Sequence, residues 1–213
     1  ACLLKQKDIS LRCSTEPYMT YCKRYLRAIL EKVKPYLITN GGNVIILQVE
    51  NEYGSFGNDK QYLAALRDFY IDCGIDVPLI TSDGDWDDML SGGTVDGCLP
   101  TLNFGSKVEE HYQNFRKRYG EDIPFMCTEF WIGWFDHWGD SHHTRSEEDM
   151  RQELEALLRI DASSNMYVFC GGTNFGFTAG SNFTDRLCPT VTSYDYCALL
   201  DERGEYTKNY YIV

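Results

Sequence analysis

The feature that most constrains the fold is a short apolar run that ends in carboxylates. Residues 44–49 form a run rich in β-branched side chains, and a glycine pair precedes it. Such a run predicts a strand buried on both faces, which suits a parallel sheet covered by helices. Glu50, Asn51 and Glu52 follow at once. Because α/β folds place their chemistry at the carboxyl ends of parallel strands, these are candidate catalytic groups, although an ordinary polar loop would give the same pattern.

A second apolar run, at residues 124–129, also ends in a carboxylate, that of Glu129. Three tryptophans follow it, Trp131, Trp134 and Trp138. Two such strands predict paired carboxylates in an aromatic-walled cleft. Glycoside hydrolysis needs this pair, because one carboxyl protonates the leaving oxygen while the other attacks the anomeric carbon or activates water. Indole faces suit the C–H faces of a sugar, and we expect Trp134 to supply that platform, while the other two tryptophans could equally be packing residues.

The rest of the chain alternates between predicted helices and strands. Three- and four-residue spacing of apolar side chains predicts helices over 16–33, 59–73, 107–119 and 147–160, and short apolar runs predict strands near residues 44, 77, 97, 124 and 165. This alternation is typical of right-handed βαβ units around a parallel sheet. An open doubly wound sheet and a (β/α)8 barrel both fit it. Candidate groups on several strand ends, and the lack of a nucleotide-binding glycine motif, favour the barrel.

The composition excludes several function classes. With 32 acidic and 20 basic residues the net charge is −12, which argues against nucleic acid as a partner. No apolar stretch is long enough to span a membrane. The nine cysteines are scattered without a Cys-x-x-Cys pair, and Cys73, Cys127 and Cys170 lie in apolar patterns that predict buried thiols. This favours a cytoplasmic location only slightly and leaves the location open. His137, His142 and His143 lack the spacing of a zinc helix, and we expect neither a metal nor a cofactor.

Four motifs resemble the β-galactosidases of glycoside hydrolase family thirty-five. They are Gly41–Gly54, Glu129–Gly139, Gly171–Gly176 and Thr192–Tyr196, and they occur in the family's order. The resemblance implies a retaining, exo-acting β-galactosidase that works through a covalent galactosyl–enzyme. It also implies that Glu52 is the general acid/base and Glu129 the nucleophile, an assignment that the residues alone do not make.

The resemblance further implies a set of galactose-binding residues. Asn51 matches the amide that binds the 2-hydroxyl of the sugar. Three tyrosines match residues that line the sugar pocket, namely Tyr167, Tyr194 and Tyr196. A tyrosine on a strand is otherwise usually a core residue, so a packing role for Tyr167 stays open. The expected partner is a small-molecule or oligosaccharide β-galactoside.

The number of strands bears on the extent of the domain. A (β/α)8 barrel has eight strands, whereas this sequence predicts five. Members of the family place the acid/base after strand four and the nucleophile after strand seven. We therefore expect residues 1–213 to be a single partial catalytic barrel domain, with strands four to eight present and the first three absent. A related exo-glycosidase acting on another sugar, and an inactive carbohydrate-binding fragment, are the alternatives.

Overall fold

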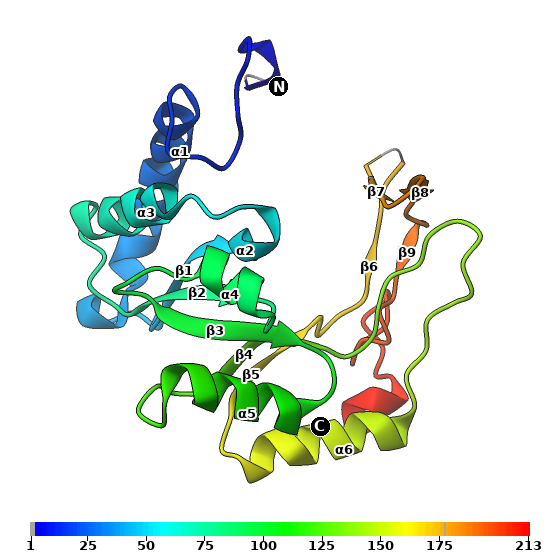
Figure 1. Ribbon diagram of the computed structural model, residues 1–213. Helices are drawn as coiled ribbons and strands as arrows, with labels where there is room; N and C mark the ends of the chain where they lie inside the picture. Colours follow the sequence, from blue (N-terminus) through cyan, green and yellow to red (C-terminus); the bar gives the residue numbers. More distant parts are fainter. Residues whose placement is uncertain (1–2, 177) are drawn as a thin grey trace. The chain divides into compact units, whose positions relative to one another are not determined.

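The computed structural model describes residues 3–176 and 178–213 (Figure 1). Within them, five parallel strands are hydrogen-bonded in chain order. They are β1 (Leu47–Asn51), β2 (Leu79–Asp83), β3 (Leu99–Phe104), β4 (Met126–Trp131) and β5 (Ser163–Tyr167). The predicted α/β class and the parallel sheet are confirmed. The chain divides into two compact units, Ala1–Leu102 and Asn103–Val213.

Helices and short hairpins connect and follow the strands. The helices are α1 (Tyr18–Val33), α2 (Tyr53–Phe56), α3 (Lys60–Asp72), α4 (Asp87–Gly93), α5 (Val108–Tyr119) and α6 (Glu147–Arg159). Two small antiparallel pairs follow β5: β6 (Gly172–Thr173) with β9 (Ser193–Tyr194), and β7 (Ser181–Phe183) with β8 (Leu187–Pro189). Turns of 3-10 helix lie at Leu3–Lys5, Lys34–Tyr36, Ile38–Asn40 and Lys208–Tyr211. None of the helices in the described part of the chain is long and apolar enough to cross a membrane.

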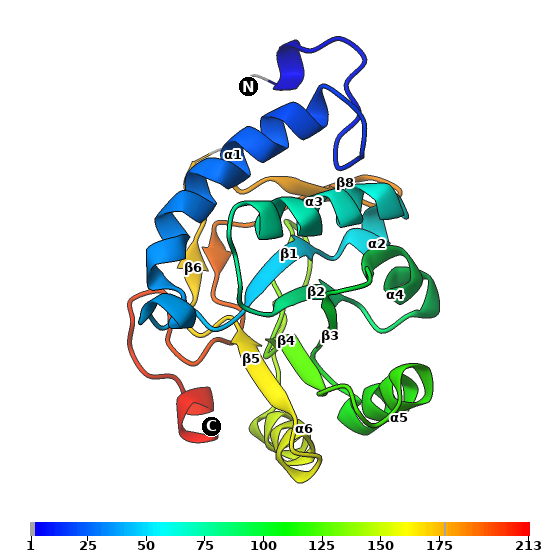
Figure 2. The same cartoon turned by 90° about the vertical axis from the view of Figure 1, so that its left-hand side faces the viewer.

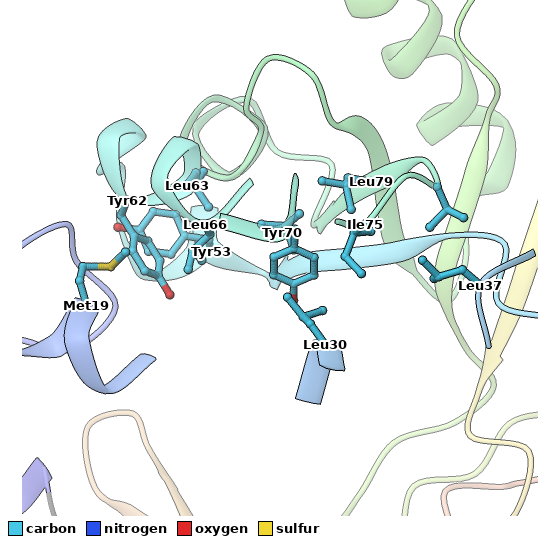
Figure 3. Packing of buried hydrophobic residues seen from close by; sticks show 12 residues of the cluster. Met19, Leu30, Leu37, Tyr53, Tyr62, Leu63, Leu66, Tyr70, Ile75 and Leu79 are labelled. Carbon is cyan, nitrogen blue, oxygen red and sulfur yellow. The ribbon is translucent and has the colours of Figure 1, made fainter. Parts of the chain in front are cut away.

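The core of the first unit lies between α1, α3, β1 and β2. Helix α3 begins after Asp59, whose carboxylate accepts a hydrogen bond from the Tyr62 amide at 3.0 Å and so caps the helix. Its apolar side chains recur at three- and four-residue spacing and share one face, which lies along β1 (Figure 2). The buried members are those that the spacing predicts: Tyr62, Leu63, Leu66, Phe69 and Tyr70. Figure 3 shows this face with Met19 and Leu30 of α1.

Two predicted burial patterns differ from the structure. Strand β1 begins at Leu47, and Val49 is its buried residue, while Ile45 just before the strand is 56% exposed. Strand β1 stands first in the sheet order and pairs with β2, so its side chains are packed less completely than those of a strand in the middle of the sheet. On α1, Tyr25 and Ile29 share the three- and four-residue spacing that predicts the helix, but both are exposed. The prediction that β1 is buried on both faces is therefore wrong.

In the second unit, a side chain of α6 caps the start of α5. The carboxylate of Glu153 accepts hydrogen bonds from the amides of Lys107, at 2.8 Å, and Val108, at 3.1 Å. Helix α6 itself begins after Ser146, whose hydroxyl accepts a hydrogen bond from the Asp149 amide at 3.1 Å. This contact caps the helix, and the predicted start of the helix at residue 147 is confirmed.

Candidate active site

The chain turns sharply at Glu52, directly after β1. Glu52 has φ 50° and ψ 38°, in the left-handed region that few residues other than glycine adopt. Its amide donates to the carbonyl of Ser82 on β2 at 2.7 Å. Its carbonyl accepts from the amide of Ser55 at 3.1 Å and from the Ser55 hydroxyl at 2.8 Å. These contacts end β1, begin α2 and hold Glu52 at the carboxyl end of the strand.

Asn51 is the last residue of β1, and it is exposed. Its Oδ1 atom accepts a hydrogen bond from Nε2 of Gln48 at 2.8 Å. The predicted sugar-binding role of Asn51 favours a strand that ends before it, because strict alternation would point its side chain away from the face of Glu50. The strand instead includes Asn51, and the register with β2 shifts between Gln48 and Asn51. Such an irregularity redirects side chains without ending the strand.

Glu50 is held by four hydrogen bonds, and its side chain is 11% exposed. Arg12 donates to both of its oxygens, from Nε at 3.0 Å and from Nη2 at 2.8 Å. The Tyr62 hydroxyl and the Asn51 amide donate the other two, at 2.9 Å and 2.6 Å. The hydrogen bond to Glu50 raises the pKa of Arg12. These contacts make Glu50 a structural residue that holds the end of β1. No sequence pattern indicated Arg12 as its partner.

Asp83, the last residue of β2, is 1% exposed. Its Oδ1 atom accepts a hydrogen bond from the Gly54 amide at 2.8 Å, so it contacts the turn that carries Glu52. Burial raises the pKa of Asp83 to about 6, the Gly54 hydrogen bond opposes this, and the charges of Glu52 and Glu50 raise the pKa further. Sequence reasoning missed Asp83 as a site residue. The available signal was the one used for Glu52, a carboxylate at the end of a strand.

In the second unit, Glu129 lies on β4, two residues before Trp131. Side chains two apart on a strand share a face, and Nε1 of Trp131 donates to Oε2 of Glu129 at 3.2 Å. An indole N–H only donates, so this contact strengthens when the carboxylate carries negative charge. The carbonyl of Trp131 accepts from Nη1 of Arg145 at 2.9 Å, which anchors the end of the strand.

An aromatic cluster lies around the end of β4. Its members are Trp131, Trp134, Phe135, Tyr167, Tyr194 and Tyr196. Trp134 packs edge-on against Trp131, with ring centroids 5.5 Å apart, and stacks on Phe135 at 5.1 Å. Trp134 remains 38% exposed despite these contacts. Trp138 is 70% exposed and takes part in none of these ring contacts.

The tyrosines predicted to bind sugar are all members of the aromatic cluster. The hydroxyls of Tyr167 and Tyr194 share a hydrogen bond of 3.2 Å. Burial, followed by that hydrogen bond, raises the pKa of Tyr194. Tyr196 is 1% exposed and stacks on Tyr194 with ring centroids 5.3 Å apart. A Cβ on Gly133 would lie 2.1 Å from the Tyr196 carbonyl oxygen, so glycine at that position permits the close approach of the two loops.

The histidines that follow β4 pair with aspartates. Asp136 contacts His142 through Oδ2 and Nδ1 at 2.6 Å, and His143 through Oδ1 and Nδ1 at 2.7 Å. Nε2 of His142 also lies 3.5 Å from Oδ2 of Asp195. Burial alone would raise the pKa of Asp136, but the hydrogen bonds from the two histidines outweigh it and lower the pKa to about 2. Across residues 3–176 and 178–213, no group of three or more His, Cys, Asp and Glu side chains is placed to hold a metal ion.

Comparison with known proteins finds similar chains along the whole length. A model of the family described as glycosyl hydrolases family 35 matches residues 1–213. A beta-galactosidase from Xanthomonas manihotis is 40% identical over 215 residues, covering 99% of this chain and 36% of the relative. Beta-galactosidase-1-like protein 3 from Mus musculus is 37% identical over 209 residues, covering 98% of this chain and 32% of the relative. The chain therefore spans about a third of the length of these curated relatives.

Solved structures also resemble the chain. A GH2 beta-galacturonidase from Eisenbergiella tayi, bound to galacturonate, matches with a TM-score of 0.60 at 14% identity, covering 93% of this chain and 36% of that one. An endo-1,4-beta-xylanase from Caldicellulosiruptor owensensis matches with a TM-score of 0.56 at 11% identity, covering 98% of this chain and 70% of that one. At these identities the likeness concerns the fold alone.

Proposed function

We propose that this chain, which belongs to glycosyl hydrolases family 35, carries the catalytic machinery of a retaining, exo-acting β-galactosidase. The substrate is a terminal, non-reducing β-D-galactoside of a small molecule or oligosaccharide. The observation that carries the proposal is the placement of two glutamates at the carboxyl ends of parallel strands. Glu52 directly follows β1, and Glu129 lies near the end of β4 beside the aromatic cluster.

Glu129 is the nucleophile of the first step. One of its carboxylate oxygens bonds to the anomeric carbon while the bond from that carbon to the leaving oxygen breaks, giving a covalent galactosyl–enzyme. The hydrogen bond from Trp131 supports this role, because it orients the carboxylate and favours its charged form. The configuration of the sugar is retained because a second displacement follows at the same carbon.

Glu52 is the general acid/base. In the first step it donates its proton to the leaving oxygen, and in the second it takes a proton from the water that attacks the anomeric carbon and releases Glu129. The left-handed backbone at Glu52 supports this role, since strained positions persist where the surrounding structure holds a functional group in place. A retaining mechanism requires the two carboxyl groups to lie about 5–5.5 Å apart.

The sugar is bound by Asn51 and the aromatic cluster. Asn51 binds the 2-hydroxyl, an interaction that strengthens in the transition state. The exposed face of Trp134 supplies the platform for the C–H face of galactose. The linked hydroxyls of Tyr167 and Tyr194 each keep a further hydrogen-bonding position for a sugar hydroxyl. Tyr196 completes the pocket wall by stacking on Tyr194.

The catalytic domain is a partial (β/α)8 barrel, in which the strands β1 to β5 correspond to strands four to eight and residues 1–213 belong to one domain. The strand order supports this assignment. The five strands follow one another in the sheet in chain order, whereas a doubly wound sheet reverses its order at a switch point. Unbroken sequential order among parallel strands is the arrangement of a barrel wall.

The roles of the two glutamates are tested by separate substitutions in the full-length protein. Glu129→Ala should abolish hydrolysis of an aryl β-galactoside, and added azide should restore turnover with formation of a galactosyl azide of inverted configuration. Glu52→Gly should largely spare kcat/KM for aryl galactosides with good leaving groups, because only a poor leaving group needs the proton in the first step. It should sharply lower kcat/KM for lactose, and kcat should fall for both substrates because the second step loses its base. Glycine suits this position, since it adopts the left-handed backbone without strain.

Exposed glutamates provide matched controls. Glu155→Ala on α6 and Glu31→Gly on α1 should leave both activities unchanged. Azide rescue of the Glu52 variant as the inverted product would show that the two roles are reversed. Activity on β-glucosides in place of β-galactosides would support the related exo-glycosidase, and a fully active Glu129 variant would refute the site altogether.

A further inference from the structure

The turn at Glu52 is held by two consecutive residues at the end of β2. The carbonyl of Ser82 accepts the Glu52 amide at 2.7 Å, and the carboxylate of Asp83 accepts the Gly54 amide at 2.8 Å. The left-handed conformation of Glu52 is costly for a residue with a side chain, so it depends on such outside contacts. One of the two contacts comes from a backbone atom that any residue would supply. The other comes from a side chain and is therefore specific to Asp83.

The surroundings of Asp83 are shaped to enclose its carboxyl group. A Cβ on Gly93 would lie 1.8 Å from Oδ1 of Asp83, so only glycine at this position of α4 leaves room for the carboxylate. A Cβ on Gly54 would lie 1.7 Å from the carbonyl oxygen of Met89, so glycine also permits the turn to approach α4. The two glycines bring α2 and α4 together around a side chain that is 1% exposed.

Burying a carboxyl group at this position lowers stability. Burial raises the pKa of Asp83 to about 6, against the Gly54 hydrogen bond, and the charge of Glu52 raises it further. A neutral asparagine could accept the same hydrogen bond without that penalty. Perturbed carboxyl groups cluster at functional sites, where charge and position matter more than stability.

We propose that Asp83 is a positioning residue for the general acid, holding the Glu52 turn through its charged hydrogen bond to Gly54. The inference rests on the proposed role of Glu52 as the acid/base. Asp83 touches neither the substrate nor the reacting atoms. A charged acceptor holds the Gly54 amide more strongly than a neutral one. This contact acts on the position of the proton donor and leaves the attack by Glu129 untouched.

The test compares two classes of substrate in the full-length protein carrying Asp83→Asn. This substitution keeps an oxygen that can accept the Gly54 amide but removes the charge. We expect kcat/KM for lactose and for galactosides with poor leaving groups to fall about 10-fold, a fraction of the whole general-acid contribution. For aryl galactosides with good leaving groups we expect a change of less than about 2-fold, because they need no proton. Asp83→Ala, which also removes the acceptor oxygen, should lower kcat/KM for each substrate class more than Asp83→Asn does.

Matched variants make each outcome decisive. Asp88→Asn, on the exposed first turn of α4, should leave both substrate classes unchanged. If Asp83 has a purely structural role, Asp83→Asn should lower kcat/KM equally for the two classes of substrate. Equal losses, or full activity on both classes, would overturn the inference. This test uses Asp83→Asn and so does not require that Asp83→Ala folds. The Glu52→Gly variant, measured beside them, separates the two claims. If it shows no leaving-group dependence the proposed acid/base role fails, whereas if it does and Asp83→Asn does not, only the positioning role fails.

Discussion

The indole N–H of Trp131 donates to Oε2 of Glu129 across 3.2 Å, from a position two residues further along the same strand. The contact connects a residue of the aromatic cluster directly to the proposed nucleophile. Trp131→Phe keeps an aromatic ring and removes the donor. Because a hydrogen bond to a charged group contributes about 1.5–3 kcal/mol, we expect kcat/KM on aryl galactosides to fall about 10- to 100-fold. Trp138→Phe is the control, since Trp138 is 70% exposed, and equal losses in the two variants would refute the specific contact.

The hydroxyls of Tyr167 and Tyr194 form one hydrogen-bonded pair, so their substitutions should not be additive. Either Tyr167→Phe or Tyr194→Phe breaks the same contact, and the double variant has no second contact to lose. We expect a coupling of about 0.5–1.5 kcal/mol in the free energy of unfolding, measured by chemical denaturation of the two single variants and the double variant. Additive losses would show that the two hydroxyls act independently.

Asp136 sets the titration of His142. The hydrogen bond to Asp136 raises the pKa of His142, so protonated His142 stabilises the folded protein below its ordinary pKa of about 6.5, and that contribution is lost as the pH rises through the higher folded value. Asp136→Asn should return the His142 pKa toward about 6.5. A proton NMR titration of the histidine ring resonances measures it. Asp140→Asn is the control, because Asp140 contacts His137 instead, and an unchanged His142 titration in Asp136→Asn would contradict the pairing.

Asp83 should make the folded protein less stable as the pH rises from about 4 to about 6. Its folded pKa is about 6, whereas an unfolded aspartate titrates near 3.9, so between these values the folded state binds a proton that the unfolded state has lost. Above about pH 6 the charged, buried Asp83 lowers the free energy of unfolding by about 3 kcal/mol. Asp83→Asn should therefore gain stability over the wild type across this window and hold the gain above it.

Chemical denaturation at pH 4, 5, 6 and 7 would test the Asp83 prediction, with Asp88→Asn as the control. A stability difference between Asp83→Asn and wild type that does not change with pH would refute it. If Asp83→Asn is more stable than the wild type and yet slower on substrates with poor leaving groups, both this prediction and the positioning role of Asp83 are supported.

The parts of the fold that sequence reasoning predicted are those with long, regular patterns. Helix α3 has a repeating apolar face and a capping Asp59, and α6 has the cap at Ser146. Helices α2 and α4 have four and seven residues, which is too few for a period to show. The hairpin of β7 and β8 is almost wholly exposed, so it lacks the alternation that marks a half-buried strand.

The candidate site was predictable where chemistry follows directly from position along the chain. Glu52 and Glu129 end apolar runs, and that signal is visible without a structure. The partners of these residues are not visible in this way. Arg12 reaches Glu50 across 38 residues, and Asp83 reaches Gly54 across 29, so each pairing depends on how the elements pack. Periodicity identifies the face of an element but not the side chain that it will meet.

The proposed role of Glu129 as nucleophile is tested most directly by identifying the residue that bonds to the sugar. A 2-deoxy-2-fluoro-β-galactosyl fluoride slows both steps but leaves a good leaving group, so the galactosyl–enzyme accumulates. Peptide mass spectrometry of the treated full-length protein would then locate the adduct. We expect one fluorogalactosyl group on the peptide containing Glu129, attached through that carboxylate and absent from Glu129→Ala. An adduct on Glu52 or on any other residue, or inactivation without an adduct, would contradict it.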